Sequence, residues 1–233
     1  MNIYYDLFIL LLVIITTAAY LIFIPLIKRK KWGQNIRTEG PRNHLRKAGT
    51  PTMGGIIIII CSIIGYLIFT RLFHFNYEIK KLMLLIIPFI GYGLVGFFDD
   101  YLIIKRHNNE GLKPSIKFIL ELVIAAGFYF LYLELGYENS LNFFGVSTKL
   151  SFFYGCFIVL LLTGFTNATN FTDGLDGLLG MVSLTSFIGI GILAYLKGEM
   201  LICYFTITII SVIIGFLIFN LPKAKIFMGD TGS

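Results

Sequence analysis

The chain has 233 residues, of which 57% are hydrophobic and 14% are charged, whereas about one quarter of a soluble domain is charged. This composition, with its strongly positive mean hydropathy, excludes an ordinary soluble protein and indicates several membrane spans. The net charge of +6 is read as anchoring to anionic lipid, and no nucleic-acid partner is expected.

Apolar runs predict an all-α integral membrane protein, a polytopic helical bundle in which residues 1–233 form a single transmembrane domain. Each run is near the roughly 20 residues that cross a bilayer. The first is longer than a signal peptide and lacks a cleavage site, so we expect it to be retained. The seven predicted spans are 7–27, 55–69, 82–98, 118–133, 150–166, 178–196 and 201–221.

The basic residues predict the orientation of these spans. With the amino terminus outside, 14 of the 19 Lys and Arg residues fall on the inner side and 5 on the outer side. This asymmetry follows the positive-inside rule. It assigns four segments to the cytoplasmic face as candidate active-site loops: 28–53, 99–117, 167–177 and 222–233.

Residues 46–55 read Arg-Lys-Ala-Gly-Thr-Pro-Thr-Met-Gly-Gly, just before the second span. Pro51 can begin a helix and Thr50 can cap it. Free amides at such a helix start, together with Lys47, would form a cradle for phosphate or carboxylate. The alternative is an ordinary capped helix with a lysine that snorkels to the interface.

Two adjacent aspartates, Asp99 and Asp100, follow the third span. Neighbours on a helix point about 100° apart, so we expect the two carboxylates to have different roles. They could instead mark the water interface. That alternative is weakened because a cytoplasmic helix end usually carries lysine or arginine.

Residues 167–177 read Asn-Ala-Thr-Asn-Phe-Thr-Asp-Gly-Leu-Asp-Gly and separate two apolar spans. If this segment is helical, Asn170, Asp173 and Asp176 recur at a spacing of three and share an acidic face. Gly174 and Gly177 would permit close approach of the backbone to a ligand or to another helix.

Like charges gathered at one membrane face repel unless a cation holds them. Oxygen ligands without a Cys or His cluster favour Mg²⁺ or Mn²⁺, and Mg²⁺ usually takes only one or two carboxylates. The remaining carboxylates should bind a sugar or base, or accept a proton. Five of the six aspartates are predicted at this face: Asp99, Asp100, Asp173, Asp176 and Asp230.

With Lys47, Lys117 and the glycine-threonine elements at 50–55 and 229–233, such a metal site suits phosphoryl transfer between a soluble diphosphate and a lipid. A cation transporter is the competing interpretation. Its carboxylates would lie near the bilayer midplane in both halves of the chain, whereas these lie at one face.

Four motifs, at residues 49–55, 98–101, 170–178 and 227–233, resemble those of bacterial phospho-N-acetylmuramoyl-pentapeptide transferases, in the same order and across essentially the whole chain. The related enzymes that transfer N-acetylglucosamine 1-phosphate to polyprenyl phosphate are the nearest alternative, and the Thr-Met-Gly-Gly element favours the former. A nucleotide-sugar or lipid transporter is the alternative from a different class.

The resemblance implies a bacterial plasma-membrane enzyme with a ten-helix fold, a cytoplasmic active site and a homodimeric state. It would use Mg²⁺ to move phospho-MurNAc-pentapeptide from UDP-MurNAc-pentapeptide to undecaprenyl phosphate, giving lipid I and UMP in peptidoglycan synthesis. The transfer could be direct, or proceed in two steps through an aspartyl phosphate.

The resemblance also implies roles for individual residues. Asp230 matches the Mg²⁺-binding aspartate, and Asp99 matches the one that deprotonates or positions the lipid phosphate, with Asp100 as its partner. Phe227 matches the aromatic ring on which uracil stacks. The implied substrate-binding residues are Lys47, Thr52, Lys117, Asn170, Asp173, Asp176, Phe227 and Gly229.

Two features depart from the family pattern. The sequence Leu102-Ile103-Ile104-Lys105 lacks a lysine that the family often has nearer to its aspartate pair, so a basic contact is missing or shifted. The sequence also stops at Ser233, where the family continues through further helices and a histidine-rich cytoplasmic loop. The chain therefore resembles a truncated member whose site the missing segment would help to close.

Overall fold

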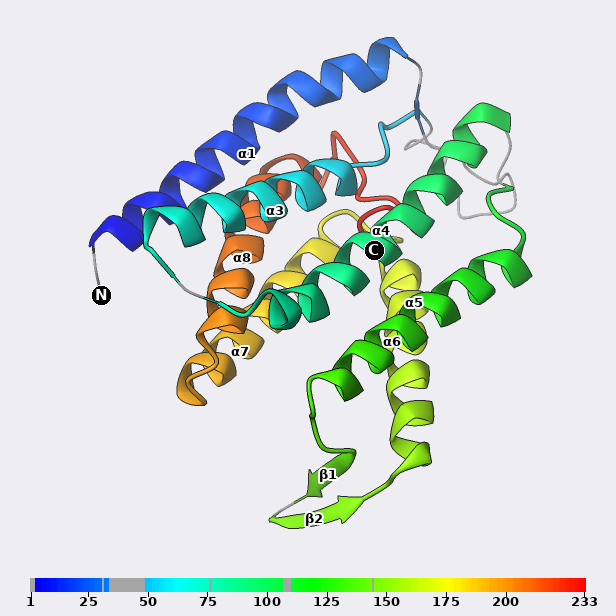
Figure 1. Ribbon diagram of the computed structural model, residues 1–233. Coiled ribbons are helices and arrows are strands. Elements are labelled where there is room, and N and C mark those ends of the chain that lie inside the picture. Colours follow the sequence, from blue (N-terminus) through cyan, green and yellow to red (C-terminus); the bar gives the residue numbers. More distant parts are fainter. Residues whose placement is uncertain (1–2, 31, 34–48, 76, 107–109, 144) are drawn as a thin grey trace.

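The computed structural model describes residues 3–30, 32–33, 49–75, 77–106, 110–143 and 145–233 (Figure 1). In this part of the chain, seven helices are long and apolar enough to cross a membrane, so the predicted polytopic helical fold is confirmed. The elements are α1 (Ile3–Arg29), α3 (Gly55–Leu72), α4 (Ile79–Arg106), α5 (Pro114–Glu134), β1 (Ser140–Phe143), β2 (Val146–Lys149), α6 (Phe152–Thr172), α7 (Leu178–Leu196) and α8 (Met200–Asn220).

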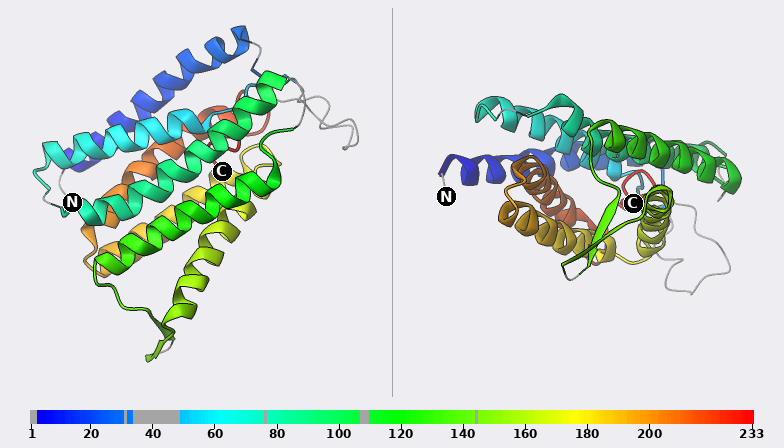
Figure 2. Two further views of the ribbon diagram at one scale, coloured as in Figure 1. Left: turned by 45° about the vertical axis from the view of Figure 1, so that its right-hand side comes forward. Right: turned by 60° about the horizontal axis from the view of Figure 1, so that its bottom comes forward.

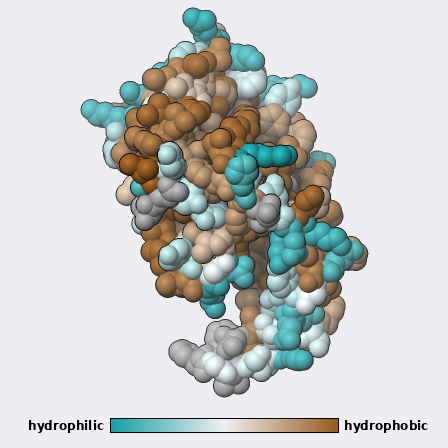
Figure 3. Space-filling view, turned by 60° about the vertical axis from the view of Figure 1, so that its left-hand side comes forward, coloured by the Kyte–Doolittle hydropathy of each residue, from teal (hydrophilic) through white to brown (hydrophobic). Residues whose placement is uncertain are grey.

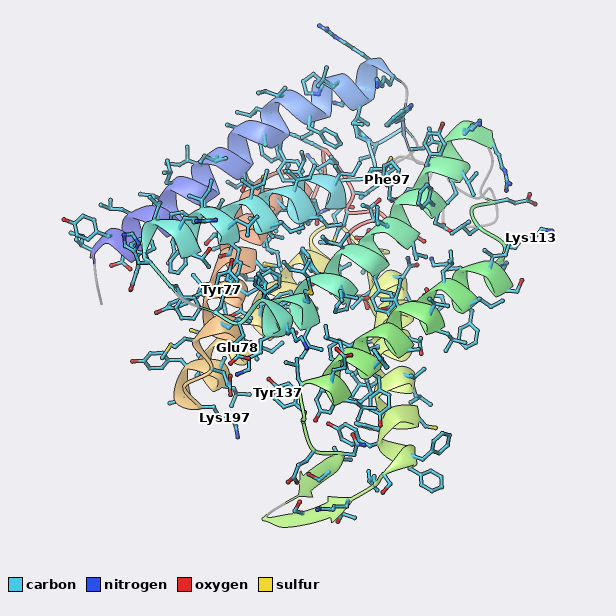
Figure 4. The ribbon with its side chains drawn as sticks, viewed as in Figure 1. Tyr77, Glu78, Phe97, Lys113, Tyr137 and Lys197 are labelled. Carbon is cyan, nitrogen blue, oxygen red and sulfur yellow. The ribbon has the colours of Figure 1, made fainter. Side chains whose placement is uncertain are left out.

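The helices form two groups that meet along α3 and α4. In the first group, α8 packs against α1, α3 and α7; in the second, α5 lies between α4 and α6 (Figures 1 and 2). Apolar side chains cover much of the face shown in Figure 3, as expected of a surface that contacts lipid. Toward one end of α4 lie Phe97 and Lys113, and toward the other lie Tyr77, Glu78, Tyr137 and Lys197 (Figure 4).

Helix α8 is the most buried helix, with 61% of its span inside the protein. Val212 and Phe216 are fully buried and pack with Leu12 and Tyr20 of α1. The buried hydroxyl groups of α8 are satisfied within the helix: those of Thr206, Thr208 and Ser211 each donate to a backbone carbonyl three or four residues earlier. A helix buried in membrane protein requires this local pairing of hydroxyl groups.

The start of α3 is held from α1 by a buried hydrogen bond. Tyr20 is completely buried, and its hydroxyl donates to the Gly54 carbonyl at 2.7 Å. The neighbouring Met53 has a φ of +68°, a left-handed conformation that non-glycine residues seldom adopt. The surrounding contacts therefore have to impose this turn.

Replacing Tyr20 by phenylalanine is expected to lower the unfolding free energy by about 0.5–1.5 kcal/mol, because the Gly54 carbonyl loses one of its two donors and keeps only the Ile57 amide. Thermal unfolding of the detergent-solubilised protein measures the effect. Thr17→Val is the control, since the Thr17 hydroxyl bonds only locally, to the Val13 carbonyl. Equal stability of the Tyr20→Phe variant and the wild type would contradict this role of the hydroxyl.

Two helix boundaries and one loop differ from prediction. Helix α3 begins at Gly55 rather than at Pro51, because Pro51 forms an isolated bridge with Gly33, and the helix has no side-chain cap. Helix α4 continues beyond Phe98 to Arg106, so Asp99 and Asp100 lie within a helix. The loop between the predicted spans 118–133 and 150–166 contains an antiparallel hairpin, in which Ser140 pairs with Lys149.

Candidate active site

The segment that follows α8, residues 221–233, is held against the start of α3 at one end of the bundle (red in Figure 1). The Phe227 amide donates to the Pro51 carbonyl at 2.8 Å, and the Gly54 amide donates back to the Phe227 carbonyl at 2.9 Å. The Gly55 amide donates to the Met228 carbonyl at 2.9 Å. The prediction that the amides at this helix start are free to bind phosphate is therefore wrong for Gly54 and Gly55.

Asp100 anchors the same segment from α4. It is 5% exposed, and its Oδ1 accepts a hydrogen bond from the Asp230 amide at 3.2 Å. Its Oδ2 accepts from the Thr231 amide at 2.9 Å and from Thr231 Oγ1 at 2.6 Å. Both carboxylate oxygens are thus occupied in fixing the backbone around Asp230.

Replacing Asp100 by asparagine is expected to lower the unfolding free energy by about 1–3 kcal/mol, since an amide group would face the Thr231 donors in a buried site. Thermal unfolding of the detergent-solubilised protein measures the effect. Thr231→Ser retains the hydroxyl and serves as the control. Wild-type stability in Asp100→Asn would refute the anchoring role.

Asp173 and Asp176 hold the segment from the opposite side. Asp173 Oδ2 accepts from the Gly229 amide at 3.0 Å, and Asp176 Oδ2 accepts from the Ala224 amide at 3.2 Å. Helix α6 ends at Thr172, so the expected acidic face shared by Asn170, Asp173 and Asp176 on one helix is not formed. Asp173 and Asp176 instead lie in the turn that follows α6, and from there they accept hydrogen bonds from the backbone of residues 224 and 229.

The Asp173 carboxyl also carries less charge than a free aspartate. Burial raises its pKa to about 7; the hydrogen bond from the Gly229 amide opposes this rise, and the charge of Asp230 adds to it. A carboxyl whose pKa is raised in this way is protonated more often at neutral pH than a free aspartate. The site is thus less negative than its number of aspartates indicates.

Asp230 and Lys117 form the centre of the site. Lys117, in the first turn of α5, donates from Nζ to Asp230 Oδ2 at 2.6 Å, and their side chains are 21% and 25% exposed. Asp99 of α4 contacts Asp230 and lies near Lys117. Its Oδ1 accepts from the Leu112 amide at 2.9 Å. Two carboxylates and one ammonium group therefore meet here, and Asp99 and Asp100 have different contacts, as expected.

The other predicted site residues lie around this centre. Asn170 Nδ2 donates to Ser233 Oγ at 3.2 Å, and Thr52 is 6% exposed. Phe227 is only 8% exposed, so its ring has little free face, and its stacking role stays a prediction. Gly229 has a φ of +74°, and a Cβ there would come within 2.6 Å of Asp100 Oδ2, so glycine is required. Lys47 lies outside the described residues.

Some residues that shape the site received no role in the sequence-based prediction. Asn220, 2% exposed, accepts from the Gly177 amide at 3.1 Å and donates to the Ile226 carbonyl at 2.9 Å. Gly96 packs against the backbone of Asp230. Glu121 is buried within α5. For Asn220 and Glu121, the sequence did offer a signal: each is a polar or charged residue inside an apolar span. Such residues in membrane proteins usually have a partner or a function.

Comparisons of this chain with known proteins identify its family. The model of glycosyl transferase family 4 matches residues 82–233, and a phospho-N-acetylmuramoyl-pentapeptide-transferase signature matches residues 47–59. A phospho-N-acetylmuramoyl-pentapeptide-transferase of Geobacillus sp. (strain WCH70) is 42% identical over 97% of this chain and 69% of its own length. The chain belongs to the phospho-N-acetylmuramoyl-pentapeptide-transferase family.

Relatives with the same name in Staphylococcus aureus are similarly close. The protein of strain bovine RF122 / ET3-1 is 40% identical over 96% of this chain and 70% of its own length, and that of strain MSSA476 has the same identity and coverage. Membership of this family and the seven apolar helices make the chain a multi-pass membrane transferase. The match to the glycosyl transferase family 4 model includes Asp99, Lys117 and Asp230.

Proposed function

We propose that this protein transfers phospho-MurNAc-pentapeptide from UDP-MurNAc-pentapeptide to undecaprenyl phosphate, forming lipid I and UMP in peptidoglycan synthesis. The observation that carries the proposal is the meeting of Asp99, Lys117 and Asp230 at one end of an apolar bundle. A soluble diphosphate and a lipid phosphate could both reach a site in that position. The names of the relatives support the same reaction.

The residues at this centre fit Mg²⁺. Asp100 has both oxygens occupied by backbone and hydroxyl donors, which leaves Asp230 as the oxygen ligand, with Asp99 beside it. In the described part of the chain, no three His, Cys, Asp or Glu side chains form a metal cage. Mg²⁺ typically uses one or two carboxylates and completes its shell with water and substrate phosphates. Bound at Asp230, it would neutralise charge on the diphosphate.

The side chains around the metal position have separate tasks in the proposed mechanism. Lys117 binds phosphate oxygens of the diphosphate, and Asp99 positions the lipid phosphate for attack on the sugar-linked phosphorus, from which UMP leaves. A phosphomonoester has a second pKa of about 6 and is mostly dianionic at neutral pH, so a general base contributes little. Asp100 keeps the Asp230 backbone in place during the transfer.

The remaining assignments complete the proposal. Lys47, Thr52, Asn170, Asp173, Asp176, Phe227 and Gly229 would line the nucleotide-sugar site. The enzyme would lie in the bacterial plasma membrane as a homodimer, with its amino terminus outside and its active site on the cytoplasmic face. The positive-inside distribution of Lys and Arg supports this orientation.

The test is UMP release from UDP-MurNAc-pentapeptide by the purified protein, with and without undecaprenyl phosphate and Mg²⁺. A version extended to the length of the relatives is measured beside it. Release that requires both additions supports the proposal. Release from UDP-GlcNAc instead would favour the related N-acetylglucosamine 1-phosphate transferases, and uptake of intact nucleotide sugar would favour a transporter.

A further inference from the structure

Glu121 is a buried carboxylate that the proposed mechanism does not use. It lies within α5, is 1% exposed, and its Oε2 accepts a hydrogen bond from Asn167 Nδ2 at 2.8 Å. Among the described residues, its Oε1 is buried and has no hydrogen-bond partner. An ionised carboxylate in an apolar span is costly unless a cation or donor approaches it, so this oxygen requires an explanation.

A small cavity connects Glu121 with the centre of the site. Its volume is about 10 Å³, and Lys117 is the one cationic residue among the described residues that line it. Asp230, Asn170 and Ser233 line the same cavity. Glu121 therefore lines the same cavity as the Lys117–Asp230 ion pair.

Lys117 can reach either carboxylate without moving its backbone. Lys117 and Glu121 are four residues apart on α5, so their Cβ atoms are separated by only about 6 Å on the same face. The lysine side chain is a flexible four-carbon stem that ends in three donors. In the structure its Nζ is bound to Asp230 Oδ2 at 2.6 Å.

Lys117 Nζ occupies one carboxylate oxygen of Asp230, so a divalent cation bound to the same carboxylate would lie beside an ammonium group. If Mg²⁺ binds Asp230, as in the proposed function on which this inference rests, the two positive charges repel and favour movement of the ammonium group to another acceptor. We propose that Glu121 is a positioning residue that accepts the Lys117 ammonium when a divalent cation occupies Asp230. Glu121 thereby makes Asp230 available to the cation while Lys117 stays beside the phosphates.

The simpler alternative is that Glu121 acts only through its own negative charge or by holding Asn167. Removing one negative charge near a metal site weakens cation binding whether or not the lysine moves. The two possibilities differ in their dependence on Lys117. A double-mutant cycle between positions 117 and 121 separates them.

The experiment measures Mn²⁺ binding to the purified membrane protein by electron paramagnetic resonance, without substrate or turnover. Glu121→Gln keeps the shape and an acceptor for Asn167, and is expected to raise the Kd about tenfold, as loss of a metal site's supporting partner does. Lys117→Met removes the competing ammonium and should lower the Kd. In Lys117→Met, adding Glu121→Gln should change the Kd by no more than about twofold. Glu134→Gln, an exposed carboxylate on the same helix, is the control.

Each result decides between the possibilities. An unchanged Kd in Glu121→Gln, or an equal tenfold rise with and without Lys117, would overturn the inference while leaving the metal site intact. Asp230→Asn tests the proposed function separately, because it should abolish Mn²⁺ binding. If Asp230→Asn binds Mn²⁺ like the wild type, the metal role of Asp230 is wrong, and the role of Glu121 is wrong with it.

Discussion

Replacing Asp230 by asparagine is expected to lower the rate of UMP release about a thousandfold, because the proposed metal ligand and the partner of Lys117 are lost together. The fold should be retained, since asparagine has the same shape and the Asp230 backbone stays bound to Asp100. The variant should therefore combine a wild-type unfolding temperature with almost no transfer.

Two measurements test whether Asp230 binds the metal ion. Initial rates at several Mg²⁺ concentrations should show no recovery in Asp230→Asn, because added cation cannot replace a missing ligand. Asp6→Asn, an exposed aspartate in the first turn of α1, should have wild-type rates. Turnover of Asp230→Asn within about tenfold of the wild type would exclude an essential metal role, since losing such charge stabilisation costs far more.

The helices could be predicted because membrane spanning imposes a length and an apolar composition on each of them. The ends could not, because the residues there make specific contacts. Thr50 and Pro51 have the composition of a helix start, yet Pro51 pairs with Gly33 and with Phe227, far away in the sequence. Tertiary pairing overrides the local propensity at such a boundary.

The candidate site was predicted as a set of residues but not as a set of roles. The sequence predicted that five aspartates lie at one face of the membrane. In the structure these aspartates lie in or around residues 224–231. Spacing could not reveal that Asp100, Asp173 and Asp176 accept hydrogen bonds from the backbone of that segment. A sequence does not distinguish an aspartate that accepts a hydrogen bond from a backbone amide from one that binds a cation.

The sequence alone also does not show where one backbone segment packs closely against another. Glycines in a membrane span are typical of close helix packing or a bend. The structure shows that Gly96 faces residues 230–231 rather than a neighbouring helix, and that a Cβ would come within 2.7 Å of the Thr231 amide. It would come closer still to the Asp230 carbonyl. Gly96 thus sets how near α4 and its two aspartates lie to Asp230.

Replacing Gly96 by alanine is therefore expected to reduce UMP release about a hundredfold, because the added methyl group must push the Asp230 backbone away from α4, and a shift of about 1 Å can cost that much. Gly127→Ala is the matched control, since no atom lies within 4 Å of a Cβ there. It should keep the wild-type rate, because alanine favours a helix more than glycine does. The Gly96→Ala protein should also bind Mn²⁺ more weakly, because the distance between Asp99 and Asp230 changes. A wild-type rate and a wild-type Mn²⁺ affinity in Gly96→Ala would show that the metal position does not depend on this contact between α4 and residues 230–231.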